Sequence, residues 1–176
     1  MKFKIFRFKK VKSTNSTAIR IIKNYKLNYG MIISETQNKG RGQYGRKWIS
    51  YKGNLFVSFF YKIEDLAVSV KQLTKINCTL VRELLSKYYK KKITFKKPND
   101  LLINKKKICG ILQESISIFD KKYLVVGIGI NLIKNPNIKN YPTINLYKLT
   151  NKKISKNKIE NKLKKIFEEK LTKLYK

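Results

Sequence analysis

The amino-acid sequence predicts an α+β fold in which a mixed, mainly antiparallel β-sheet is backed by helices. Residues 93–131 carry one strand pattern after another, with turn residues between them. Three other stretches, which begin near residues 13, 66 and 156, have apolar or capping residues at positions typical of helices. A chain of 176 residues with 42% hydrophobic content is long enough to bury the core of one domain.

The first part of the chain is predicted to hold three strands and one helix. Apolar and polar residues alternate over residues 3–11, which predicts an opening strand. Residues 13–17 are Ser, Thr and Asn, which cap helices, so a helix is expected to follow them. Residues 31–34 predict a short strand, and the aromatic and β-branched run at residues 55–63 predicts a long buried strand.

The second part begins with an amphipathic helix at residues 66–88, whose aliphatic stripe is expected to pack on the core. A strand then stops at Pro98, because proline cannot donate to a β-ladder. The next two strands form a hairpin around residues 105–106, which lets Asp100 and Lys107 face one site from neighbouring strands. The predicted strands are residues 93–96, 101–104, 107–118 and 123–131, and a closing helix covers residues 156–174.

Residues 40–48, with the sequence Gly-Arg-Gly-Gln-Tyr-Gly-Arg-Lys-Trp, combine three glycines with three cations. Glycine lets backbone N–H groups approach a ligand closely, and arginine offers a planar pair of donors to phosphate or carboxylate oxygens. A solvated basic turn is the plainer alternative. We interpret the segment as a loop that binds an anion.

The same glycines fit the G-x-G-x-x-G spacing of dinucleotide-binding folds. In that motif a helix begins directly after the glycines, and its N-terminus meets the pyrophosphate. Here the strand at residues 55–63 follows instead. The sequence therefore predicts a glycine–arginine loop between two strands, which covers its anion without a helix dipole.

Charge and composition restrict the chemistry. The chain has 42 Lys and Arg residues against 10 Asp and Glu, a formal net charge of +32, and no histidine. Histidine acid–base catalysis and histidine metal sites are therefore excluded. The lysines are spread over every segment, which suits a lysine-biased genome as well as a nucleic-acid surface. Nucleic-acid binding is kept as an alternative function of a different class.

The two cysteines and the N-terminal residues indicate the cellular setting. Cys78 and Cys109 lie in apolar contexts without C-x-x-C spacing, so both are expected to be buried free thiols in a reducing environment. The first eight residues lack the continuous apolar run of a signal peptide or membrane span. We expect a cytoplasmic protein without a membrane segment.

Four blocks of the sequence resemble the motifs of biotin protein ligases in order and spacing. Residues 13–15, Ser-Thr-Asn, also match the motif that precedes the first helix of those enzymes. The matched motifs extend over residues 13–131, and they imply the class II synthetase-like catalytic domain of that family. The four blocks are residues 35–48 (the glycine–arginine loop and its approach), 96–101 (Lys-Lys-Pro-Asn-Asp-Leu), 107–112 (Lys-Ile-Cys-Gly-Ile-Leu) and 127–131 (Gly-Ile-Gly-Ile-Asn).

The resemblance implies a ligase that uses ATP, biotin and Mg²⁺. In that family the biotin carboxylate attacks the α-phosphate of ATP to give biotinyl-adenylate, and a lysine amine of a biotin carboxyl carrier domain then takes the biotinyl group. Both steps gather negative charge, which preorganised cations stabilise. The resemblance implies catalytic roles for Lys107, Arg41 and Asp100, and Asp100 either holds Mg²⁺ or orients the incoming lysine amine.

Binding roles also follow from the resemblance. Hydroxyls near the first helix would bind the ureido ring of biotin, Gln37 would fix biotin, two glycines would line its slot, and Asn131 would meet the adenine. The implied biotin and adenylate contacts are Ser13, Thr14, Asn15, Gln37, Gly40, Arg41, Gly42, Gln43, Lys107, Gly110, Gly129 and Asn131. Secondary contacts are Arg46, Lys47, Trp48, Lys96 and Asn99.

Two positions depart from the family pattern. Gln43 stands where the pattern usually has arginine, and Lys97 stands where it usually has tryptophan. Glutamine cannot make the charged bidentate contact of a guanidinium, so the loop is expected to hold the adenylate less firmly. A lipoate–protein ligase is the alternative enzyme, because it shares the fold and the adenylate chemistry.

The chain is expected to be a single catalytic domain over residues 1–176. It has room for neither the N-terminal DNA-binding domain nor the C-terminal β-barrel domain that many members of the family add. DNA binding and repressor activity are therefore not expected. The expected partner is the biotin carboxyl carrier domain of a carboxylase, and a homodimer is compatible with the resemblance.

Overall fold

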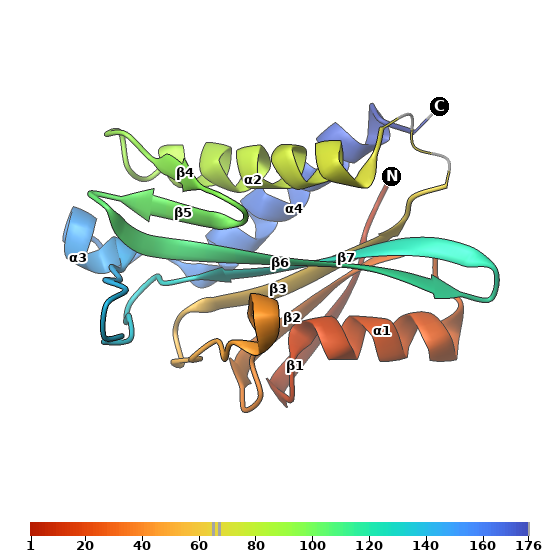
Figure 1. Ribbon diagram of the computed structural model, residues 1–176, viewed down its shortest axis with the longest axis horizontal. Helices are drawn as coiled ribbons and strands as arrows, with labels where there is room; N and C mark the ends of the chain where they lie inside the picture. Colours follow the sequence, from red (N-terminus) through yellow and green to blue (C-terminus); the bar gives the residue numbers. More distant parts are fainter. Residues whose placement is uncertain (65, 67, 176) are drawn as a thin grey trace.

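A seven-stranded sheet runs through the computed structural model of the protein, which describes residues 1–64, 66 and 68–175 (Figure 1). The strand order is β1-β2-β3-β7-β6-β5-β4. β1 and β2 are parallel, and the other five neighbouring pairs are antiparallel. The strands are β1 (Lys4–Val11), β2 (Tyr29–Gln37), β3 (Leu55–Lys62), β4 (Thr94–Lys96), β5 (Asp100–Ile103), β6 (Lys106–Ile118) and β7 (Lys121–Ile130).

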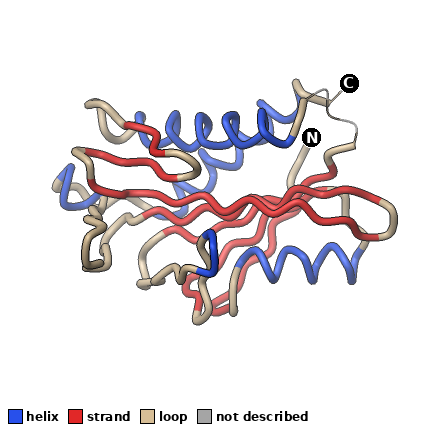
Figure 2. The backbone as a smooth tube through the Cα atoms, in the orientation of Figure 1, coloured by secondary structure: helices blue, strands red, loops and turns tan. Residues whose placement is uncertain are grey.

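Helices cover both faces of this sheet (Figure 2). The helix α1 (Thr14–Tyr25) lies on one face, and α2 (Val70–Ser86) and α4 (Lys156–Thr172) lie on the other. Successive side chains of a strand point to opposite faces, so β3 packs Phe59 on the side of α2 and α4 and Phe60 on the side of α1. The Phe59 ring stacks on Phe167 of α4, with 4.1 Å between the ring centroids.

The predicted fold class is confirmed: the sheet is mixed, mainly antiparallel and backed by helices. β3 shows why its sequence is apolar at every position. It lies between β2 and β7 and has helices on both faces, so residues 55–61 are all buried. The glycine–arginine loop does connect two strands, β2 and β3, as predicted.

The largest boundary error concerns α2, which begins at Val70 and not near residue 66. Ser69 and Gln72 form a capping box, in which each side chain bonds the other residue's backbone or side chain, and this fixes the helix start. Leu66 lies outside the helix and forms an isolated bridge with Tyr175.

Two further elements differ from the prediction. β2 extends over nine residues, from Tyr29 to Gln37, because it pairs with β1 on one side and β3 on the other. The short helix α3 (Leu146–Thr150) was not predicted, although its cap follows the usual chemistry: the Asn145 side chain accepts a hydrogen bond from the backbone N–H of Lys148. The closing helix α4 ends at Thr172, close to its predicted end.

Both cysteines are buried and free, as predicted. Burial, together with a smaller effect of the Asp100 charge, raises the pKa of the Cys78 thiol to about 11. Burial also raises the pKa of Cys109 well above its ordinary value. Among the described residues, no helix is long and apolar enough to cross a membrane.

Candidate active site

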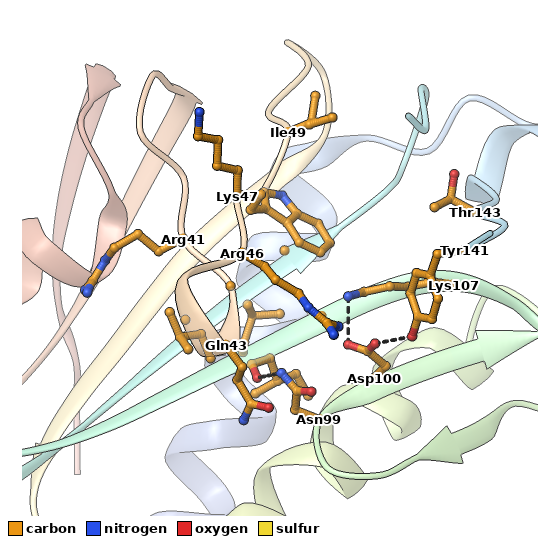
Figure 3. Close-up of a pocket in the computed structure, with 18 of the residues that line it drawn as sticks. Arg41, Gln43, Arg46, Lys47, Ile49, Asn99, Asp100, Lys107, Tyr141 and Thr143 are labelled. Carbon is orange, nitrogen blue, oxygen red and sulfur yellow. Dashed lines mark hydrogen bonds and ion pairs between the residues drawn. The ribbon is translucent and has the colours of Figure 1, made fainter. Parts of the chain in front are cut away.

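A cavity of about 880 Å³ opens beside the middle of the sheet (Figure 3). Its walls come from the start of α1, the loop between β2 and β3, the β4–β5 turn, β6, β7 and the segment after β7. Every residue that the sequence assigned to the site lines this cavity, apart from Gly40. The structure thus brings together residues that are more than 100 positions apart in the chain.

The glycine–arginine loop is a small hairpin. Its backbone N–H groups at Trp48 and Gly42 donate to the carbonyls of Gly40 and Arg46, at 2.9 and 2.6 Å. Side chains on a hairpin alternate between two faces, so Arg46 and Trp48 share one face, whereas Arg41 and Lys47 share the other. Figure 3 shows Arg46 directed into the cavity, whereas Arg41 and Lys47 point away from its centre. The Trp48 indole also lies in the cavity, against the two glycines of its floor.

The floor of the cavity is a bare patch of backbone formed by Gly110 of β6 and Gly129 of β7, which lie directly opposite each other. The Trp48 indole lies against this patch, because a Cβ added to Gly129 would come within 2.5 Å of it and one added to Gly110 within 2.7 Å. The resemblance implied that these two glycines line the biotin slot, and in this structure the Trp48 indole takes that place. The indole Nε1 is buried and has no hydrogen-bond partner in the described part of the chain.

The start of α1 is tied to the end of β2. Gln37 Oε1 accepts hydrogen bonds from the backbone N–H and the hydroxyl of Thr14, at 2.8 and 3.1 Å, and Gln37 Nε2 donates to Ser50 Oγ at 3.2 Å. Ser13 occupies the cap position of the helix, but its side chain makes no capping hydrogen bond. Its hydroxyl is therefore not consumed by the helix, and it lines the cavity.

Both the oxygen and the nitrogen of the Asn15 side-chain amide form hydrogen bonds. Its Oδ1 accepts from Ser58 Oγ at 2.5 Å, and its Nδ2 donates to Glu114 Oε2 at 2.7 Å. Gly127 makes room for this side chain, because a Cβ there would lie only 2.2 Å from Asn15 Oδ1. Asn15 thus anchors α1 to β3, β6 and β7, in addition to lining the cavity. Sequence reasoning missed Ser58 and Glu114, which belong to no motif.

At the other end of the cavity, Lys107 Nζ forms an ion pair with Asp100 Oδ1 at 2.8 Å (Figure 3). The predicted approach of these two residues is confirmed. A β-bulge in the β5–β6 pairing places Asp100 opposite Gly110 but Leu102 opposite Lys107, so Lys107 and Gly110 share a face although they are three residues apart. Without the bulge, Lys107 and Gly110 would lie on opposite faces of β6.

Tyr141 completes this end of the site, and sequence reasoning gave it no role. Its hydroxyl donates to Asp100 Oδ2 at 2.5 Å. Burial raises the pKa of Tyr141 well above its ordinary value, the hydrogen bond with Asp100 and the charge of Asp100 raise it further, and the charge of Arg46 opposes them. Figure 3 likewise shows the Arg46 guanidinium directed toward the Lys107–Asp100 pair.

Arg41 is not brought to this cluster. Its Nη2 forms an ion pair with Glu114 Oε2 at 2.7 Å, near the start of α1. The structure therefore separates Arg41 from Lys107, two residues for which the resemblance implied catalytic roles. Arg46, ranked as secondary, is the loop arginine that faces Lys107 and Asp100.

The residues around Asp100 do not fit a resident Mg²⁺ ion. Both carboxylate oxygens are engaged, one by Lys107 and one by Tyr141, and Asp100 is the one carboxylate among the residues that line the cavity. The described residues contain no group of three His, Cys, Asp or Glu side chains able to hold a metal.

Three remaining predicted residues lie around the same cavity. Asn99 Nδ2 donates to the carbonyl of Ile111 at 2.8 Å, which fixes the β4–β5 turn against β6. Lys96 Nζ lies 4.4 Å from the ring centroid of Tyr141. Asn131 Nδ2 donates to the carbonyl of Ile144, whereas its Oδ1 is buried and has no partner in the described part of the chain.

The sequence of this chain matches the model of the Biotin/lipoate A/B protein ligase family over residues 7–131. The chain belongs to this family. The match covers every motif identified in the sequence, but it ends before Tyr141. The part of the site that follows β7 is therefore supplied by a segment outside the family match.

Similar proteins are biotin ligases. The bifunctional ligase/repressor BirA of Escherichia coli is 36% identical over 102 residues, which are 57% of this chain and 32% of that protein. BirA of Bacillus subtilis is 32% identical over 127 residues, with 71% and 39% covered. The biotin–[acetyl-CoA-carboxylase] ligase of Paracoccus denitrificans is 29% identical over 127 residues, with 70% and 52% covered. The chain thus spans about a third to a half of these relatives.

Solved structures of this family share the fold. The biotin protein ligase of Aquifex aeolicus in complex with biotin and ATP is 30% identical, with a TM-score of 0.82 over 98% of this chain and 72% of that chain. LipL1 of P. falciparum in complex with lipoate has a TM-score of 0.63 at 14% identity, a likeness of fold alone.

Proposed function

We propose that this chain is a biotin protein ligase, which activates biotin with ATP as biotinyl-adenylate and transfers the biotinyl group to a lysine of a biotin carboxyl carrier domain. The observation that carries the proposal is the composition of the cavity. The cavity has a glycine floor, on which the Trp48 indole lies, next to the Lys107–Asp100 pair and Arg46, so one cavity offers an apolar part and a cationic end. Family membership supports the same reading.

Polar atoms without partners also support a ligand in this cavity. Trp48 Nε1 and Asn131 Oδ1 are buried, line the cavity and lack hydrogen-bond partners in the described structure. A buried polar group without a partner costs free energy, on the order of 1–3 kcal/mol. A bound substrate that supplies one acceptor and one donor would remove that cost.

In the proposed first step, a carboxylate oxygen of biotin attacks the α-phosphorus of ATP. A bond from that oxygen to phosphorus forms, the bond to the bridging oxygen breaks, and pyrophosphate leaves with the electron pair. Negative charge accumulates on the phosphoryl oxygens, where Lys107 Nζ and the Arg46 guanidinium would stabilise it. Mg²⁺ would accompany ATP as part of the substrate, and no protein residue is assigned to it.

In the proposed second step, the target lysine nitrogen attacks the acyl carbon of biotinyl-adenylate. An amide bond forms, the bond from the acyl carbon to the phosphate oxygen breaks, and AMP leaves. The amine also loses a proton. Asp100 is the acceptor that this chain offers there, once Lys107 has turned from its Oδ1 to the phosphate. This assigns Asp100 to the lysine amine, one of its two predicted roles.

The decisive experiment is exchange of labelled pyrophosphate into ATP, driven by biotin or by lipoate. We expect exchange with biotin, and a loss of about a hundredfold or more in Lys107→Ala, because one preorganised donor to the developing charge is removed. Lys121→Ala is the matched control, since Lys121 is exposed and begins β7 at the far end of the hairpin. Exchange with lipoate alone, or full activity of Lys107→Ala, would contradict the proposal.

A further inference from the structure

The two carboxylate oxygens of Asp100 have different partners. Oδ1 forms an ion pair with Lys107 Nζ at 2.8 Å but accepts no hydrogen bond within the described residues, and Oδ2 accepts a hydrogen bond from the Tyr141 hydroxyl at 2.5 Å. Asp100 itself is buried, with 9% of its surface exposed. An ammonium group facing a carboxylate with two free oxygens can bind both of them, but here only one oxygen is left for Lys107.

The backbone holds Tyr141 at this position from the side of Lys107. The N–H of Lys107 donates to the carbonyl of Pro142, and the carbonyl of Lys107 accepts from the N–H of Ile144, both at 2.9 Å. Thr143 and Lys107 accordingly form an isolated parallel bridge. The segment after β7 therefore pairs with Lys107 through two backbone hydrogen bonds, as a neighbouring strand would. Tyr141 is the residue directly before this paired segment.

The Tyr141 ring also lies among three cations. The ammonium groups of Lys96 and Lys107 lie 4.4 and 5.4 Å from its centroid, and the Arg46 charge acts on its hydroxyl. A face of an aromatic ring attracts a cation without neutralising it. The ring can thus steady Lys107 while leaving its charge available to an anion in the cavity.

We propose that Tyr141 is a positioning residue for Lys107 and acts through Asp100. By donating to Oδ2, the hydroxyl draws charge from the carboxylate and restricts the ion pair to Oδ1. Both effects weaken the hold of Asp100 on Lys107, so the ammonium moves to the phosphoryl oxygens at a smaller cost. The proposal rests on the proposed adenylation and adds a residue that lies outside the family match.

The test compares Tyr141→Phe with wild type in biotin-dependent pyrophosphate exchange. The variant keeps the ring and removes the hydroxyl, so Lys107 is expected to stay on Asp100. We expect kcat to fall about tenfold to a hundredfold, the range for losing a hydrogen bond to a charged group, with the KM for biotin unchanged. Tyr147→Phe is the matched control, because Tyr147 is exposed and does not line the cavity.

A double-mutant cycle separates this role from a structural one. If Tyr141 acts through the charge of Asp100, Tyr141→Phe has no further effect in an Asp100→Asn background. An equal loss in both backgrounds, or a wild-type kcat for Tyr141→Phe with an unchanged melting temperature, would overturn the proposal. If wild-type protein itself shows no biotin-dependent exchange, the proposed function fails, which is a separate result.

Discussion

Arg41 and Glu114 form an ion pair, with 2.7 Å between Nη2 and Oε2, and the same carboxylate oxygen accepts a hydrogen bond from Asn15. One oxygen on β6 thus joins the glycine–arginine loop to the start of α1. The pair is partly exposed, with 42% of the Arg41 side chain accessible, so its own contribution is expected to be about 1 kcal/mol or less. The main effect of the ion pair is to hold the glycine–arginine loop against the sheet.

Removal of this link should loosen the loop and affect retention of the intermediate. We expect Arg41→Ala and Glu114→Gln each to speed release of biotinyl-adenylate about fivefold, which corresponds to about 1 kcal/mol. Release is measured by trapping the free adenylate after single-turnover loading. The double variant should behave like either single variant, because both changes remove the same contact. Additive effects would show that the residues act separately.

Arg46 should instead affect the rate of adenylation, because it faces Lys107 and Asp100. We expect Arg46→Ala to lower kcat for pyrophosphate exchange by about a hundredfold, as for other donors to a developing charge. Lys47→Ala is the control from the opposite face of the same hairpin. A larger rate loss in Arg41→Ala than in Arg46→Ala would restore Arg41 to the reactive centre.

Gln43 lines the cavity at the tip of the loop, where an arginine is usual in the family. A neutral amide forgoes a charge-assisted hydrogen bond worth about 1.5–3 kcal/mol, so part of the adenylate should escape and label nearby lysines. The measurement is biotin labelling of an unrelated bystander protein by wild type and by Gln43→Arg. The arginine variant should label less. Carrier-only labelling by wild type would show that another group seals the loop.

The net charge of +32 should steer an acidic carrier domain toward this protein. Salt screens such steering, since the Debye length is about 10 Å at 0.1 M ionic strength. Transfer to the carrier should therefore slow as salt rises, whereas exchange with small substrates should change less. Equal salt dependence of both steps would argue against steering. Retention on DNA that resists salt would favour the alternative nucleic-acid function.

The buried Cys78 thiol should make stability fall at alkaline pH. Its pKa is raised from 9.0 to about 11 in the folded chain, so between these values the unfolded chain loses the proton first and is favoured. This contribution is complete below pH 9 and lost above pH 11, and two pKa units correspond to about 2.7 kcal/mol. Urea unfolding between pH 8 and 11 measures the slope. Cys78→Ala should reduce the slope without abolishing it, because the raised pKa of Cys109 contributes in the same direction, and an unchanged slope would exclude Cys78 as a source.

Local patterns predicted much of this fold. Two elements could be predicted from residues close together in the chain. β3 has a continuous apolar run, and α2 has an aliphatic stripe with helical spacing. The β5–β6 hairpin was predicted with its turn at residues 105–106, and the turn lies one residue earlier: Asn104 and Lys105 both have positive φ, and this two-residue turn sets the register that brings Asp100 and Lys107 together. The motifs contain most of the residues that line the cavity, but not Ile49 or the five lining residues after β7, which include Tyr141.

The sequence by itself determined the fold class, the family motifs and most of the residues of the cavity, because these depend on local chemistry. Only the tertiary structure decided which side chains of the site contact one another. Whether Arg41 or Arg46 faces Lys107 depends on how the loop hairpin pairs, and the β-bulge decides that Lys107 shares a face with Gly110. Glu114 and Tyr141 reach Arg41 and Asp100 across 73 and 41 positions of the chain. No periodic pattern encodes such contacts, since they arise from the packing of separate elements.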